Sequence, residues 1–168
     1  MYMNILCDIK DVPNELCSIM VNMPKYNYAI YYYPLFVNIR DNDICLLEIS
    51  RNDRDWKKFF KNGEILYYND LYIDDGKTED GPSPPKLYDI IIIDNKQMNV
   101  LYFEKEKENI KPNGVFIIEN IEDDDVDNYQ EILDNWRINI KSFSFRLFAI
   151  PNSNNKIDNR ICIIQRLY

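Results

Sequence analysis

Acidic and amide side chains stand at or just beyond the ends of four apolar runs in the sequence. The runs are 44–49, 64–68, 87–93 and 115–118. Carboxylate and amide oxygens can bind a sugar hydroxyl, hold Mg²⁺ or move a proton. If the four runs are neighbouring strands, their polar ends meet at one edge of a sheet and form the candidate site. The side chains concerned are Glu48, Asn69, Asp70, Asp94, Glu119 and Asn120.

Any acid–base chemistry at this candidate site must depend on carboxylates, because the sequence contains no histidine. That absence removes the commonest general base, the histidine-activated serine and cysteine nucleophiles, and the usual imidazole metal ligand. The cysteines offer no replacement. They are scattered without a Cys-x-x-Cys spacing, so we expect reduced thiols and no zinc site. They stand at Cys7, Cys17, Cys45 and Cys162.

The central part of the chain predicts a strand, a crossover helix and a second strand. Residues 87–93 end in four isoleucines without polar alternation, as in a strand with both faces covered. Residues 97–109 have a partly apolar face on a charged helix. Lys111-Pro112-Asn113-Gly114 should stop that helix, and 115–118 is the next strand. Ligands of such parallel units bind beyond the carboxyl ends of the strands.

The rest of the sequence extends this unit into one α/β domain. We expect strands at 44–49 and 64–68 before it, and a loop rich in Gly, Pro and acids at 74–85 where a further helix and strand would stand. After it we expect a helix at 129–136 and two late strands at 138–150 and 160–167. A polar turn joins the last two, which predicts an antiparallel hairpin at one sheet edge.

An aromatic region precedes the first predicted strand, with Pro34 expected to break any simple helix through it. Its six aromatic side chains lie between positions 26 and 36. Two interpretations stay open: a helix whose tyrosines are half buried against the sheet, which we favour, and an exposed aromatic patch for a partner. Further on, we expect Asp53 or Asp55 to cap a short helix. The aromatic residues Trp56, Phe59 and Phe60 of that helix should be core.

Length and charge exclude several classes of protein. At 168 residues we expect a single domain, with an N-terminal helical and aromatic region at 1–43 and an α/β core at 44–168. The net charge of -8 argues against a nucleic-acid partner, because phosphate binding depends on lysine and arginine. No apolar stretch approaches the length of a membrane span and no leader is evident. We therefore expect a cytoplasmic protein without membrane partners.

Four phrases of the sequence, taken in order, resemble class I S-adenosylmethionine-dependent methyltransferases. The similarity is greatest to the group related to macrocin O-methyltransferase and the cephalosporin hydroxylases, and it covers residues 26–125. It implies an abbreviated Rossmann-like sheet, mostly parallel, with a C-terminal antiparallel hairpin. The phrases are LLEI (46–49), WKKFFKNGEILYYND (56–70), YDIIIID (88–94) and KPNGVFIIENI (111–121).

The resemblance also assigns roles to the polar residues. Glu48 and Ser50 would border the cofactor loop after the first strand, and Asp70, or Asn69 beside it, would hold the adenosine ribose. Asp94 and Glu119 would be catalytic if the protein is active. Asp94 and Asn120 would be the remaining ligands of a weak Mg²⁺ site.

The departures from the family pattern fall on these same positions. Ser50-Arg51-Asn52-Asp53 stands where a glycine-rich loop approaches the cofactor. Asp94 keeps only one acid of an Asp-Asp-Gly-Ser-His signature, and Asn120 replaces an aspartate, which weakens the case for S-adenosylmethionine and Mg²⁺.

Two functional hypotheses follow from this pattern. The first, which the departures favour, is a non-catalytic binding or assembly module that takes a small molecule or protein partner, or a second copy of itself, through its tyrosine-rich region and final strand. The second is an active O-methyltransferase that acts on a sugar or small-molecule hydroxyl. A groove filled by Arg51, Tyr67 or another side chain would support the first hypothesis, and an open groove the second.

Overall fold

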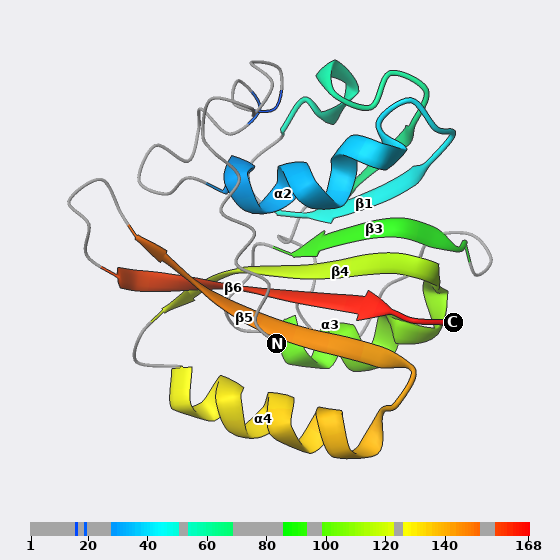
Figure 1. Cartoon of the computed structure of the whole chain (residues 1–168). Helices are drawn as coiled ribbons and strands as arrows, with labels where there is room; N and C mark the ends of the chain where they lie inside the picture. Colours follow the sequence, from blue (N-terminus) through cyan, green and yellow to red (C-terminus); the bar gives the residue numbers. More distant parts are fainter. Residues whose placement is uncertain are drawn as a thin grey trace.

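The computed structural model describes one six-stranded sheet with helices on both faces (Figure 1). Residues 16, 19, 28–50, 54–68, 86–93, 99–122, 126–151 and 157–168 are described. The strands are β1 (Cys45–Ile49), β2 (Glu64–Tyr68), β3 (Tyr88–Ile93), β4 (Ile110–Glu122), β5 (Phe143–Pro151) and β6 (Ile157–Arg166). The helices are α2 (Ala29–Phe36), α3 (Asn99–Glu106) and α4 (Val126–Asn139), with short 3-10 turns η2 (Val37–Ile39), η3 (Trp56–Lys58) and η5 (Lys107–Asn109).

The strand order is β2-β1-β3-β4-β6-β5, and the predicted fold class is confirmed. Strands β1, β2, β3 and β4 pair in parallel. Strand β6 pairs antiparallel with both β4 and β5, so the predicted C-terminal hairpin closes one edge of the sheet. Because β1 leads to β2 on one side and β3 joins it on the other, a topological switch point lies between β1 and β3.

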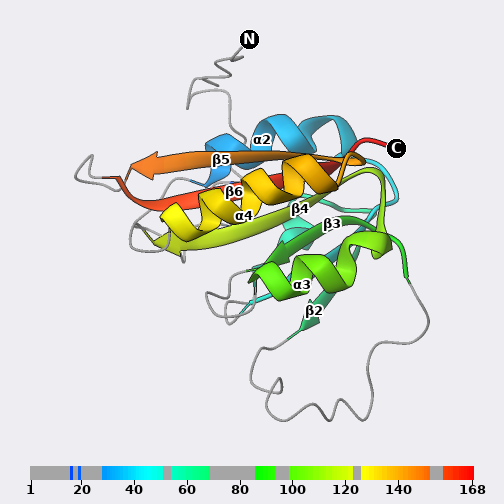
Figure 2. The ribbon, with the colours of Figure 1, turned by 90° about the horizontal axis from the view of Figure 1, so that it is seen from below.

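Two apolar clusters fill the spaces above and below the sheet. Alternate residues of each strand point to opposite faces. On the α2 face, Ile92 and Ile117 pack with Phe36 of the helix. On the opposite face, Ile91 packs with side chains of α3 and α4, among them Phe103. The molecule therefore has three layers: α2 on one face, the sheet, and α3 with α4 on the other face. Figure 2 shows it from the side of α3 and α4.

Helix α2 corrects one prediction and refines another. Pro34 lies inside the helix, so the expectation that it would break the helix was wrong. Proline removes only the hydrogen bond from its own nitrogen, and the Val37 N–H still bonds to the Tyr33 carbonyl one turn further on. The described tyrosines agree with the favoured interpretation of a helix packed on the sheet, although the burial goes further than expected: Tyr28 and Tyr32 are fully buried and Tyr31 is half buried.

Strand β4 is longer than predicted and has two irregularities. It begins at Ile110, so Lys111-Pro112-Asn113-Gly114 belongs to the strand and does not separate it from the helix. The pairing register with β3 shifts across this segment, where Asn113 has a φ of 64°. A side chain at position 114 would meet the Lys111 carbonyl oxygen at 2.8 Å, which explains the glycine there. The second irregularity lies at Asn120, near the carboxyl end.

Several other expectations have outcomes. The crossover helix is confirmed as α3 with η5, and the helix expected at 129–136 is α4. The loop expected at 74–85 lies outside the described residues. Among the helices that the structure describes, none is both long and apolar enough to cross a membrane.

Candidate functional site

Two parallel strands bring Glu48 and Glu119 to the same face and edge of the sheet. Glu48 of β1 pairs with Ile92 of β3, and Ile92 pairs with Ile117 of β4. Glu119 lies two residues beyond Ile117 and therefore on the same face. Both carboxylates lie under α2, and both are buried, with 1% of Glu48 and none of Glu119 exposed.

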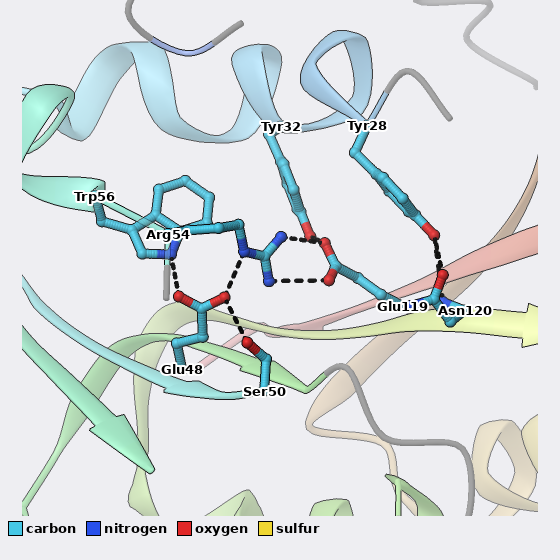
Figure 3. A network of polar contacts seen from close by, with 8 residues as sticks. All are labelled: Tyr28, Tyr32, Glu48, Ser50, Arg54, Trp56, Glu119 and Asn120. Carbon is cyan, nitrogen blue, oxygen red and sulfur yellow. Dashed lines mark hydrogen bonds and ion pairs between the residues drawn. The ribbon is translucent and has the colours of Figure 1, made fainter. Parts of the chain in front are cut away.

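The side chain of Arg54 joins these carboxylates across strand β3 (Figure 3). Its Nε donates to Glu48 Oε1, while Nη1 and Nη2 donate to Glu119 Oε1 and Oε2 at 2.7 and 2.9 Å. The second contact is a parallel two-bond pairing, which is the strongest geometry available to arginine and a carboxylate. Only 2% of Arg54 is exposed.

The residues beside Arg54 complete the hydrogen bonding of Glu48. Trp56 Nε1 donates to Glu48 Oε2 at 2.7 Å, and Ser50 Oγ donates to Glu48 Oε1 at 3.2 Å. The Trp56 ring also packs against the guanidinium, whose central carbon lies 5.3 Å from the ring centroid. Glu48, Ser50, Arg54, Trp56, Glu119 and Tyr32 are called the buried ion cluster below.

Helix α2 contributes the last member of the cluster and a second contact beside it. Tyr32 donates its hydroxyl to Glu119 Oε1, and Tyr28, one helical turn earlier, donates to Asn120 Oδ1 at 2.9 Å (Figure 3). Tyr32 stacks on Phe36 with ring centroids 5.2 Å apart. Tyr28 and Tyr32 of the predicted aromatic region therefore point inward and bond to the end of β4.

The backbone at Asn120 allows both tyrosines to reach neighbouring residues of one strand. Consecutive side chains of a regular strand point to opposite faces. Asn120 has a φ of 56°, and the pairing of β4 with β6 shifts between Ile118 and Ile121. This left-handed residue places the Asn120 amide on the α2 side, beside Glu119 (Figure 3). Asparagine adopts that conformation more readily than most side chains.

Burial dominates the electrostatics of the cluster. It raises the pKa of the Glu48 carboxyl, and the adjacent Arg54 guanidinium opposes that shift. Burial lowers the pKa of Arg54, but the negative charges of Glu119 and Glu48 and the hydrogen bond to Glu119 outweigh it, so the Arg54 pKa lies well above its ordinary value. Burial and the charge of Glu119 raise the pKa of Tyr32 well above 10. Arg54 is therefore a permanent cation, and Tyr32 keeps its proton at neutral pH.

The structure describes some of the predicted site residues and not others. Glu48, Ser50 and Glu119 belong to the cluster, and Asn120 adjoins it. The remaining predicted residues, Asn69, Asp70 and Asp94, lie outside the described residues, as does Arg51. Within the described part of the chain, no group of three or more acidic, cysteine or histidine side chains is placed to hold a metal ion.

Arg54 is a site residue that the sequence pattern did not predict. A signal was available, because two glutamates at the ends of buried strands need a cation or several hydrogen-bond donors. Tyr67, which was named as a candidate to fill the groove, donates its hydroxyl to the Arg54 backbone carbonyl. The capping role expected of Asp55 was wrong: Asp55 precedes η3 without a side-chain capping bond, and it lies 3.7 Å from Lys58 Nζ instead.

Comparison with known proteins gives matches at the level of structure. No protein-family model and no curated protein sequence matches this chain. The MycE methyltransferase from the mycinamycin biosynthetic pathway, in complex with Mg, SAH and mycinamycin VI, superposes with a TM-score of 0.61 and 15% identity. The match covers 93% of this chain and 54% of MycE, so the chain spans about half the length of that enzyme.

Two further structures agree with this match. An O-methyltransferase from Bacillus cereus in complex with SAH has a TM-score of 0.55 at 17% identity, over 92% of this chain and 91% of that one. A methyltransferase from Pyrococcus furiosus has a TM-score of 0.51 at 12% identity, over 82% of each chain. Together with the strand order and the antiparallel hairpin, these likenesses show that the chain has the fold of the class I S-adenosylmethionine-dependent methyltransferases.

Proposed function

We propose that this protein is a non-catalytic methyltransferase-like module whose cofactor site has been converted into a structural ion cluster. One observation carries the proposal: the Arg54 side chain bonds both to Glu48, to which the resemblance assigns a role with the cofactor, and to Glu119, to which it assigns a role in catalysis. An enzyme needs such side chains to bind a ligand, and here both of them bind Arg54 instead.

The bonding of Glu119 supports this proposal. A general base must accept a proton from a substrate within hydrogen-bonding reach. Glu119 already accepts from both Nη atoms of Arg54 and from the Tyr32 hydroxyl. Breaking those bonds would leave an uncompensated charge in a buried place. Glu119 is thus better suited to holding α2 and the Arg54 segment on the sheet than to proton transfer.

The loop chemistry supports the same proposal. A cofactor loop of this fold depends on glycine so that backbone can approach the ligand closely. No glycine occurs between Glu48 and Trp56, where Arg54 contributes a large side chain instead. The residues present therefore fit S-adenosylmethionine poorly.

The alternative function is an active O-methyltransferase that acts on a sugar or small-molecule hydroxyl. Its support is that MycE and the Bacillus cereus enzyme are both described with SAH, and MycE also with Mg. For this alternative, Arg54 would have to leave both carboxylates before a ligand could reach them.

Calorimetric titration of the chain with S-adenosylmethionine and S-adenosylhomocysteine, with and without Mg²⁺, tests the proposal. We expect no heat of binding up to about 1 mM ligand, which corresponds to a free energy weaker than about -4 kcal/mol. An Asp70→Ala variant is the matched control. Micromolar binding that is lost in this variant would establish a working cofactor site and overturn the proposal.

We also propose that such a module binds a partner, which is a small molecule, another protein or a second copy of the chain. The final strand β6 is an unsuitable contact because it lies inside the sheet, between β4 and β5. The edge strands of the described sheet are β2 and β5. At β5, two backbone carbonyls already accept hydrogen bonds from side chains, Phe145 from Arg137 and Ala149 from Tyr31. Light scattering after size-exclusion chromatography tests self-association, and a mass of one chain at all concentrations would exclude it.

A further inference from the structure

The buried ion cluster contains two carboxylates and one guanidinium. Glu48, Glu119 and Arg54 are each at most 2% exposed. Every bond recorded from Arg54 to these carboxylates is a donation by its guanidinium nitrogens. Because isolated carboxylates are costly to bury, the site requires a cation at this position.

The geometry of the contacts selects a planar cation with several N–H donors. Glu119 receives two parallel bonds from Nη1 and Nη2, while Glu48 is reached from a different edge by Nε. A compact ammonium ion has donors but lacks this flat, forked arrangement. The Trp56 ring, 5.3 Å from the guanidinium carbon, adds an aromatic surface that favours a cation further.

Both carboxylates also accept hydrogen bonds from side chains other than Arg54. Glu48 is fixed by Trp56 and Ser50, and Glu119 is fixed by Tyr32 of α2. The two acids stand on strands that pair through β3. Their placement therefore does not depend on the covalent link between the guanidinium and the chain.

From these observations we propose that the space between Glu48 and Glu119 is a guanidinium-binding site, for which the Arg54 side chain is the resident ligand. A free guanidinium or methylguanidinium ion binds there when the Arg54 side chain is removed. This inference concerns the chemistry of the site and stands apart from whether the wild-type chain binds S-adenosylmethionine.

Thermal unfolding of an Arg54→Ala variant tests the inference. We expect its Tm to fall below that of the wild type and to rise again with guanidinium chloride between 0 and 50 mM, compared with NaCl at the same ionic strength. At ten times the dissociation constant the rise should be roughly 3–6 °C. The wild type should show no such rise, because its own side chain fills the site.

Two small molecules and three variants serve as controls. Urea has a similar shape without the charge, and ammonium chloride has the charge without the fork, so neither should restore the Tm. An Arg54→Ala/Glu119→Gln double variant should lose most of the guanidinium effect, whereas Arg54→Ala/Tyr168→Phe, altered at an exposed residue outside the cluster, should keep it. An Arg146→Ala variant, altered at an exposed residue of β5, should not respond.

Equal recovery with guanidinium, ammonium and sodium ions would overturn the inference, as would no recovery at all. If Arg54→Ala does not fold, its refolding yield in low guanidinium against NaCl gives the same comparison, and an unchanged yield would again overturn it. Cofactor binding by the wild-type chain would contradict the proposed function while leaving this test intact.

Discussion

At the scale of single residues, Arg54 converts two acids that would repel each other into one bonded unit. A buried ion pair adds little net stability over apolar side chains, but removal of one partner is costly because a charge stays behind without compensation. Without Arg54, both Glu48 and Glu119 would be buried charges without a compensating cation, so the stability of the fold depends on Arg54. The sequence predicted that these acids share an edge, because strand ends align in a parallel sheet. It did not predict Arg54, because this residue lies outside the strands and its place does not follow from strand pairing.

Replacement of Arg54 by methionine tests this dependence. We expect Arg54→Met to lower the free energy of unfolding by about 3–5 kcal/mol, because both carboxylates lose their cation while the apolar stem is kept. Urea unfolding followed by circular dichroism measures the loss. The matched control Arg146→Met changes an exposed arginine and should stay within about 0.5 kcal/mol of the wild type. A similar small change for Arg54→Met would mean that the ion cluster does not stabilise the fold.

The Tyr32 hydroxyl should make stability depend on alkaline pH. Its pKa in the folded protein is raised by burial and by Glu119, so its contribution is complete below pH 10. Above pH 10 the unfolded chain loses this proton and the folded chain keeps it, so stability falls as pH rises. Tyr32→Phe should be less stable than the wild type by about 1.5–3 kcal/mol at pH 8, with a narrowing difference above pH 10.

Urea unfolding at pH 8, 10 and 11 gives this comparison. Tyr168→Phe, which alters an exposed residue far from the cluster, should follow the wild type at each pH. A difference between Tyr32→Phe and the wild type that stays constant across the series would contradict the assigned cause.

At the scale of elements, one left-handed residue determines how α2 attaches to the sheet. Because Asn120 has a positive φ, its amide meets Tyr28 while Glu119 meets Tyr32. The sequence predicted the strand and the polar residues at its end, since the apolar run stops there. It could not predict the bulge, because asparagine is common both in turns and at strand ends and its φ is set by the pairing of β4 with β6. The same limit explains the error at Lys111–Gly114, whose turn-like residues form an irregular part of β4.

Two substitutions at Asn120 separate the backbone effect from the lost hydrogen bond. Asn120→Gly and Asn120→Ala both remove the amide that Tyr28 contacts. Alanine is strained at a φ of 56° and glycine is not, so Asn120→Ala should be less stable by about 1 kcal/mol. Chemical denaturation of the two variants in parallel measures the difference. Equal stabilities would show that the left-handed backbone imposes no measurable strain there.

At the scale of the whole molecule, the sheet order was predictable in part. Parallel strands and a final hairpin followed from the lengths and compositions of the apolar runs. Which hairpin strand lies inside was not predicted, although the pattern contains the answer. Residues 161–164 (ICII) form an unbroken apolar run and are all buried, as expected of an interior strand, whereas β5 begins with alternating apolar and polar residues at 143–146 (FSFR).

Two thiols in the sheet report on the integrity of the whole fold. Burial raises the pKa of Cys162 to about 12, and it also raises the pKa of Cys45. Because the thiolate is the reactive form, iodoacetamide at pH 8 should leave both side chains unlabelled in the native protein and label them in urea. Mass spectrometry of the peptides measures this. Rapid native labelling of Cys162 would show that the sheet opens readily at β6, which lies between β4 and β5.

The interior position of β6 has a consequence for the order of events on the ribosome. Strands β4 and β5 are synthesised before the strand that joins them, so neither has its shared neighbour until residues 157–166 have left the exit tunnel. During that interval both present unpaired edges, which are the usual starting points of aggregation. Nascent chains stalled before residue 157 should therefore recruit chaperones more strongly than released chains that contain β6.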